Sequence, residues 1–233
     1  MDDISNKILM FHTQLESDVN HRNKSWEHCY NYFTGNEIDV DIACLHMSFY
    51  LASWGMYRGS SFLLQKDYLI HKEVVEHILK NKHLQKINYQ DLEKTHIEEL
   101  FILINWIKDW YQNNIKSING VTRKINVTDT LTTKIILGTL GCVPAYDRYF
   151  IDGLRAKGLS YSGLKPINFR PVVRFYLENK PSIDYVNIKI LETSGVNYPP
   201  MKLVDMYFWQ LGFEADKKQY NKAISSDGKK RRS

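Results

Sequence analysis

TLTTKIILGTLGCVPAYDRYF, residues 130–150, carries the signals of two consecutive helices joined by a short turn. The polar, threonine-rich start includes one lysine, Lys134, and the apolar run that follows ends at Gly141, a residue suited to a helix C-terminus. A turn containing Pro144 then leads to Asp147, at the start of the next helix. The stretch therefore predicts an apolar two-helix unit that presents one amine and one carboxylate at its opposite ends.

Helical periodicity continues over the rest of the chain and predicts an all-α fold. Apolar residues recur at helical spacing, for example from Ile42 to Met56, whereas no series of alternating strands is present. Asp129 or Thr130 is expected to cap the helix that contains Lys134. A last helix is expected over residues 201–211, ended by Gly212.

The charge distribution divides the chain more clearly than any linker does. The net charge of +5 combines −5 over residues 1–115, +7 over 116–180, −3 over 181–216 and +6 over 217–233. The sequence predicts one helical domain over residues 1–216, either undivided or made of two lobes, 1–115 and 116–216, with a cleft between them. It also predicts a disordered basic tail over 217–233. A basic region on a nearly neutral body is typical of a polyanion-binding face, although a solvated basic surface gives the same pattern.

Several kinds of site and cofactor have no support in the sequence. Metal-binding pairs such as CxxC or HExxH, phosphate-binding glycine loops and the GxSxG elbow do not occur, so we expect no metal and no cofactor. The acidic N-terminus lacks a signal-peptide pattern, and no apolar run approaches the roughly 20 residues of a membrane span. Three isolated cysteines favour reduced thiols and a cytoplasmic protein without membrane contact.

The two-helix unit resembles the helix-hairpin-helix DNA glycosylases over about residues 130–148. In that superfamily a lysine stands near the head of a helix, and a catalytic aspartate follows a glycine and a V-P-type turn. The resemblance implies catalytic roles for Lys134 and Asp147 and double-stranded DNA, with the target base extruded, as the partner. A fixed carboxylate can stabilise the oxocarbenium-like sugar formed when an N-glycosidic bond breaks, or activate water, whereas Asp147 as a simple helix cap would do neither.

Two departures from the family pattern bear on the lysine. The residues before Lys134 are NVTDTLTT in place of hairpin glycines, and Lys134 and Asp147 are 13 positions apart, fewer than usual in the family. We therefore expect an enzyme that releases the base without a covalent lysine intermediate. The basic stretch around the unit would hold the DNA backbone, through Arg123, Lys124, Thr132, Thr133 and Arg148.

The segment SFYLASWGMYRGSSF, residues 48–62, offers a candidate base pocket. Small residues let a ligand approach the backbone closely, and they surround aromatic and cationic side chains that can stack on an extruded base or bond to it. Tight helix packing explains the small residues equally well. The predicted pocket residues are Trp54, Tyr57 and Arg58, with Trp26 and Tyr146.

Two alternatives stay open on the sequence alone. Arg22 and His28, in RNKSWEH, resemble the signature of HEPN-type ribonucleases, where the arginine steadies the scissile phosphate and the histidine assists the 2′-hydroxyl. A helical interaction module that docks an acidic partner would need neither pair. The leading hypothesis is a DNA glycosylase-like enzyme that acts in repair or in defence against foreign DNA.

Overall fold

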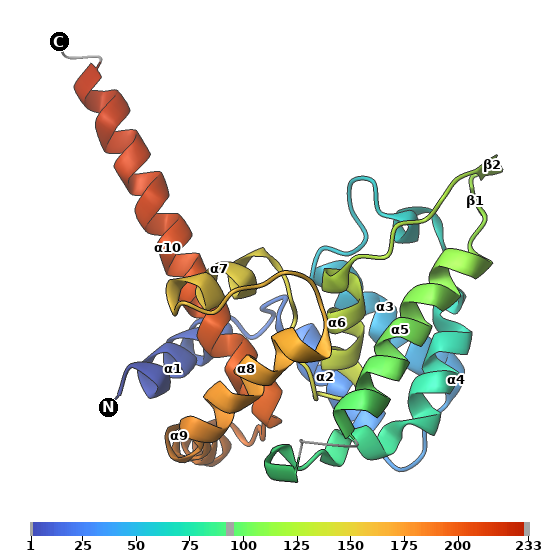
Figure 1. Ribbon diagram of the computed structural model, residues 1–233, viewed down its shortest axis with the longest axis horizontal. Coiled ribbons are helices and arrows are strands. Elements are labelled where there is room, and N and C mark those ends of the chain that lie inside the picture. Colours follow the sequence, from blue (N-terminus) through green and yellow to red (C-terminus); the bar gives the residue numbers. More distant parts are fainter. Residues whose placement is uncertain (1, 92–95, 231–233) are drawn as a thin grey trace.

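The computed structural model describes residues 2–91 and 96–230 and confirms the all-α prediction (Figure 1). A two-residue antiparallel pair, β1 (Ser117–Ile118) with β2 (Val121–Thr122), is the only sheet in that part of the chain. Short 3₁₀ turns connect some of the helices: η1 (Phe62–Gln65), η2 (Tyr68–His71), η3 (Lys82–Lys86) and η4 (Tyr89–Asp91). The helices are α1 (Asp3–Glu16), α2 (Lys24–Thr34), α3 (Val40–Ser53), α4 (Lys72–Lys80), α5 (His96–Asn114), α6 (Asp129–Thr139), α7 (Arg148–Ala156), α8 (Pro166–Glu178), α9 (Lys180–Ser194) and α10 (Pro200–Lys230).

The helices form two groups side by side, and α6 stands where the groups meet (Figure 1). One group holds α2 to α6, and the other holds α1 together with α7 to α10. Because α1 packs against α9 and α10, the division between the groups does not follow the predicted boundary at residue 115. Every residue of α6 from Leu131 to Thr139 is buried, so this helix is enclosed by its neighbours, among them α2, α3 and α5.

The ends of α6 and α7 are set by local chemistry. The Thr128 hydroxyl caps α6 by accepting a hydrogen bond from the Leu131 amide at 3.2 Å, so the cap lies one residue before the two candidates that the sequence suggested. The helix ends where Gly141 adopts a left-handed backbone, with φ at +67°, as expected. Asp147 caps α7 by accepting from the Phe150 amide at 3.1 Å, which was also expected.

Two glycines allow α7 and α10 to cross in direct backbone contact. A Cβ atom added at Gly153 would lie 1.9 Å from the Phe208 carbonyl oxygen, and one added at Gly212 would lie 1.9 Å from the Tyr149 carbonyl oxygen. The prediction that Gly212 ends the last helix was therefore wrong, because its missing side chain serves the crossing instead. Helix α10 continues to Lys230, into the segment predicted as a disordered basic tail, and residues 231–233 of that tail lie outside the described part.

Candidate functional site

The turn between α6 and α7 is held by hydrogen bonds at successive peptide groups. The Tyr146 amide donates to the Thr133 hydroxyl at 2.9 Å, and the Tyr146 carbonyl accepts from the Thr130 hydroxyl at 2.8 Å. The Asp147 amide donates to the Ala145 carbonyl at 2.8 Å. These bonds fix the direction in which the chain enters α7, and with it the position of the Asp147 side chain.

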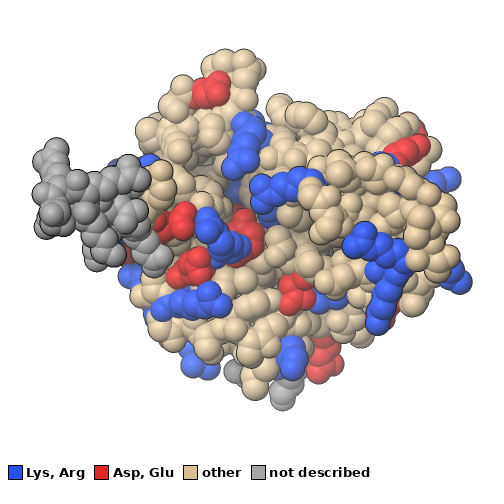
Figure 2. Space-filling view, turned by 90° about the horizontal axis from the view of Figure 1, so that it is seen from above, with Lys and Arg blue, Asp and Glu red and all other residues tan. Residues whose placement is uncertain are grey.

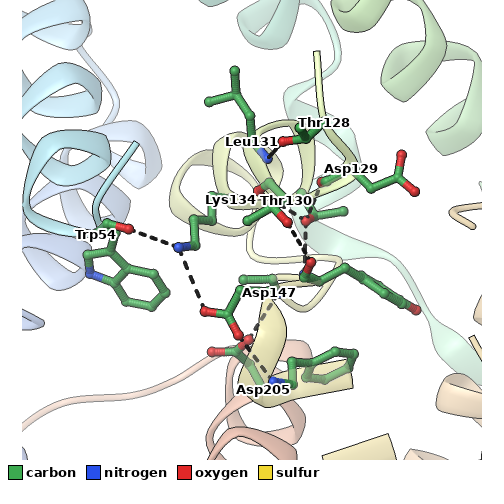
Figure 3. Close-up of polar contacts among 12 residues, drawn as sticks. Trp54, Thr128, Asp129, Thr130, Leu131, Lys134, Asp147 and Asp205 are labelled. Carbon is green, nitrogen blue, oxygen red and sulfur yellow. Dashed lines mark hydrogen bonds and ion pairs between the residues drawn. The ribbon is translucent and has the colours of Figure 1, made fainter. Parts of the chain in front are cut away.

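Asp147 faces Lys134 (Figure 3), although the sequence placed the two at opposite ends of the two-helix unit. The Lys134 ammonium lies 3.7 Å from Asp147 Oδ2 and donates a hydrogen bond to the Trp54 carbonyl at 2.9 Å. Only 5% of Lys134 is exposed, and this burial lowers the pKa of its ammonium, although the nearby carboxylates of Asp147 and Asp205 oppose the shift. The pair is thus a largely desolvated ammonium beside a partly exposed carboxylate.

This pair lines a cleft of about 430 Å³ where the two groups of helices meet. Aromatic side chains line it together with charged ones, and three of the charged residues are arginines. The lining residues are Phe11, Arg22, Asn23, Trp54, Gly55, Met56, Arg58, Thr130, Lys134, Asp147, Arg148, Tyr149, Asp205 and Trp209. The cleft therefore combines flat apolar surfaces with both signs of charge, a composition suited to a planar ligand that carries phosphate groups.

A second buried ion pair lies beside the first and was missed in the sequence. Lys202 Nζ lies 3.2 Å from Asp205 Oδ2, and both side chains are almost fully buried. Burial lowers the pKa of the Lys202 ammonium and raises that of the Asp205 carboxyl group. One signal was available, because these are the only two charged residues in the apolar run MKLVDMYFW at 201–209.

Of the predicted base-pocket residues, Trp54 and Arg58 line the cleft. The Arg58 guanidinium lies against Gly55, where an added Cβ would be 3.2 Å from Arg58 Cζ. Tyr57 is not among the lining residues, and its hydroxyl instead bonds to His71 Nε2 at 2.8 Å.

Trp26 and Tyr146 belong to the core and correct the prediction that they line the pocket. The Trp26 indole donates to the Leu137 carbonyl at 3.0 Å, and its ring stacks on Tyr30. Tyr146 is 1% exposed and packs against Phe150. Both are large aromatic side chains on segments beside the cleft, and the sequence does not show which side of such a segment faces inward.

The predicted DNA-backbone residues fall into two classes. Arg148 is exposed at the cleft, where it pairs with Asp216 at 3.1 Å, and Arg123 and Lys124 are exposed along an adjoining hollow of about 410 Å³ that shares Met56 with the cleft. Figure 2 shows Lys and Arg side chains on several sides of a hollow in this face, with acidic side chains nearby.

Thr132 and Thr133 are wrongly predicted as backbone contacts, because both are fully buried. The Thr132 hydroxyl bonds to the Thr128 carbonyl at 3.3 Å, and the Thr133 hydroxyl donates to the Asp129 carbonyl at 2.7 Å. A polar, threonine-rich helix start is typical of an exposed end, but here the hydroxyl groups satisfy buried backbone groups of α6 and of the turn that follows it.

The two residues of the ribonuclease signature do not meet in the cleft. Arg22 lines it from the segment before α2, whereas His28 is exposed on α2 and is not among the lining residues. Arg22 precedes α2 and His28 lies within it, so the two side chains do not share one helix face. Arg22 thus joins the cleft's cations without its proposed partner.

Within the described residues, no cluster of three or more His, Cys, Asp or Glu side chains could hold a metal ion, and none of the helices has the length and apolarity of a membrane span. Neither protein-family models, nor curated proteins, nor solved structures yield a match to this chain.

Proposed function

We propose that the protein binds DNA and hydrolyses the N-glycosidic bond of an extruded base in the cleft. One observation carries the proposal: Asp147 and Lys134 lie in one cleft with Trp54 and Arg58, although these pairs are about 80 residues apart in the chain. The arrangement fits the resemblance of residues 130–148 to helix-hairpin-helix DNA glycosylases. It supplies a carboxylate, aromatic surfaces and phosphate-binding cations in one place.

The roles of these groups follow from the chemistry of the bond. When the bond between the base nitrogen and C1′ breaks, the electron pair leaves with the base and C1′ becomes oxocarbenium-like. Asp147 stabilises that positive charge or takes a proton from the water that attacks C1′, while the departing base gains a proton. The partly exposed rings of Trp54 and Trp209 are the aromatic surfaces on which the base would stack.

The cations of the cleft bind the DNA backbone in this proposal. Arg22, Arg58 and Arg148 surround the reaction site, and Arg123 and Lys124 extend the positive surface along the adjoining hollow. The buried, unpaired thiols of Cys29, Cys44 and Cys142 fit a reducing compartment, and we place the protein in the cytoplasm, acting in repair or in defence against foreign DNA.

The decisive experiment is base release by the Asp147→Asn variant. Asparagine caps helices about as well as aspartate, so the fold and DNA affinity are retained while the charge facing C1′ is lost. We expect the rate of base release to fall on the order of a hundredfold or more. The assay supplies duplex DNA with normal and modified purines and pyrimidines and detects the free base.

Asp152→Asn is the matched control, because Asp152 lies on α7 and pairs with Arg155 away from the cleft. Its rate should equal that of the wild type. Full activity in Asp147→Asn would remove this carboxylate from the mechanism. RNA cleavage that is lost in His28→Ala would instead support the ribonuclease hypothesis.

A further inference from the structure

The buried Asp205 carboxylate binds the turn that carries Asp147. Asp205 Oδ1 accepts a hydrogen bond from the Ala145 amide at 2.9 Å, and both residues are buried. The carbonyl of the same residue, Ala145, accepts from the Asp147 amide at 2.8 Å. Two consecutive hydrogen bonds therefore link a side chain of α10 to the backbone of Asp147.

Lys202 makes the burial of Asp205 tolerable. A buried carboxylate without a partner is strongly destabilising, and the Lys202 ammonium at 3.2 Å supplies the opposite charge. That ammonium also lies close to three aromatic rings, at 4.7 Å from the centre of Trp54, 5.1 Å from Phe11 and 5.2 Å from Trp26.

Trp54 contacts both lysines of the two ion pairs. Its carbonyl accepts from Lys134, whose ammonium also lies 5.5 Å from the centre of the Trp54 ring. Lys202 therefore contacts the residue that holds Lys134, and Asp205 holds the turn that carries Asp147. The two ion pairs are therefore connected twice: Lys134 and Lys202 both contact Trp54, and Asp205 binds the turn that carries Asp147.

We infer that Asp205 is a positioning residue for Asp147, acting through the Ala145 amide, and that Lys202 is the counter-ion that keeps Asp205 in place. The inference rests on the proposed function for its effect on catalysis. The hydrogen bond from Ala145 is the essential element, so a neutral side chain that still accepts this bond should replace Asp205. A side chain of similar shape that cannot accept it should not.

The test compares two double variants, each of which removes both buried charges and leaves none unpaired. Lys202→Met with Asp205→Asn keeps an acceptor for the Ala145 amide, and Lys202→Met with Asp205→Leu does not. We expect kcat for base release within about threefold of wild type in the first and at least about tenfold lower in the second, with KM and DNA affinity unchanged in both. Lys7→Met with Glu214→Gln is the control, because this pair, with atoms 2.6 Å apart, joins α1 to α10 outside the cleft.

Equal kcat values in the two double variants, high or low, would overturn the inference, because the hydrogen bond would then not be the cause. Hydrogen exchange of the Ala145 amide provides a readout that needs no activity. It should be slow in the wild type and the asparagine variant and faster in the leucine variant. If the wild type released no base from any DNA, the proposed function would fail, whereas equal exchange in both variants would contradict the positioning role itself.

Discussion

Asp147 uses its two carboxylate oxygens for different purposes. Oδ1 caps α7 through the Phe150 amide, and Oδ2 lies toward the Lys134 ammonium. Capping and catalysis are therefore not exclusive readings of this residue, and the loss of charge in Asp147→Asn separates them. Lys134 has the second oxygen as its neighbour, and its own role can be tested chemically.

We expect no covalent adduct between Lys134 and DNA. A nucleophilic lysine forms an imine with the opened sugar, and borohydride reduces that imine to a stable cross-link. The Lys134 ammonium is held by the Trp54 carbonyl at 2.9 Å, and only 6% of the side chain is exposed, so C1′ has poor access to it. Denaturing gels after borohydride treatment measure the adduct. A cross-link in the wild type that disappears in Lys134→Gln would show that the lysine is the nucleophile.

His71 should make the protein less stable in mild acid. It is fully buried between the hydroxyls of Tyr57 and Tyr111, and burial lowers its pKa to about 3. Below its ordinary value of about 6.5 the unfolded state takes up a proton that the folded state does not, so stability present above that pH is lost as the pH falls towards 3.

The corresponding measurement is the free energy of unfolding in urea between pH 6 and pH 4. We expect the wild type to lose about 1.4 kcal/mol more per pH unit than His71→Gln does. The same slope in both proteins would mean that His71 accepts a proton within the fold.

The site was predictable only where its chemistry is local. Asp147 could be placed at the start of α7 because a glycine, a turn and an apolar helix adjoin it in the sequence. The Ala145 amide and the Asp205 carboxylate are 60 residues apart, and no local pattern specifies that contact. Thr133 was wrongly predicted to lie at the surface, whereas its hydroxyl accepts a hydrogen bond from the Tyr146 amide inside the protein.

At the scale of elements, the crossing of α7 and α10 determines where the start of α7 lies. Because the two backbones touch at Gly153 and Gly212, a methyl group at either position has no room. We expect Gly153→Ala and Gly212→Ala each to lower the free energy of unfolding by about 1–3 kcal/mol, despite the higher helix propensity of alanine. Base release per folded molecule should fall as well, because Asp147 moves with α7.

Urea denaturation measures the loss, and Arg155→Ala is the control on the exposed side of α7. That variant breaks only the exposed pair with Asp152 and should change stability by less than about 1 kcal/mol. Wild-type stability in both glycine variants would mean that the helices can separate without consequence. The prediction that Gly212 ends the helix was wrong because close helix contact favours glycine as much as helix termination does.

Across the whole molecule, the cations that line the cleft and the adjoining hollow come from both the acidic and the basic parts of the chain. Residues 116–180 carry 11 Lys and Arg against 4 Asp and Glu, but only some of these cations lie near the cleft. We expect Arg123→Glu with Lys124→Glu to weaken DNA binding and to lower the slope of log affinity against log salt by about two. Arg170→Glu with Arg174→Glu makes the same change in net charge on α8, outside the cleft and the adjoining hollow, and should leave the slope nearly unchanged.

Fluorescence anisotropy of labelled duplex DNA over a series of salt concentrations gives both quantities. Equal effects of the two double variants would show that net charge alone attracts the DNA.

The all-α class was predictable because apolar periodicity repeats along most of the chain. The grouping of α1 with α7 to α10 could not be predicted, because periodicity identifies the buried face of a helix but not the helix that packs against it.

The contacts around Trp54 also have a consequence for the order of folding. Lys134 meets Trp54 across 80 residues of sequence, and Asp205 meets Ala145 across 60. Closing such long loops has an entropic penalty that is offset only after the intervening helices have packed. We therefore expect the groups of the candidate site to come together among the last events of folding, and no fragment ending before α10 contains them all. Recovery of base release during refolding should lag behind recovery of helical circular dichroism, so catalysis would itself report completion of the native state.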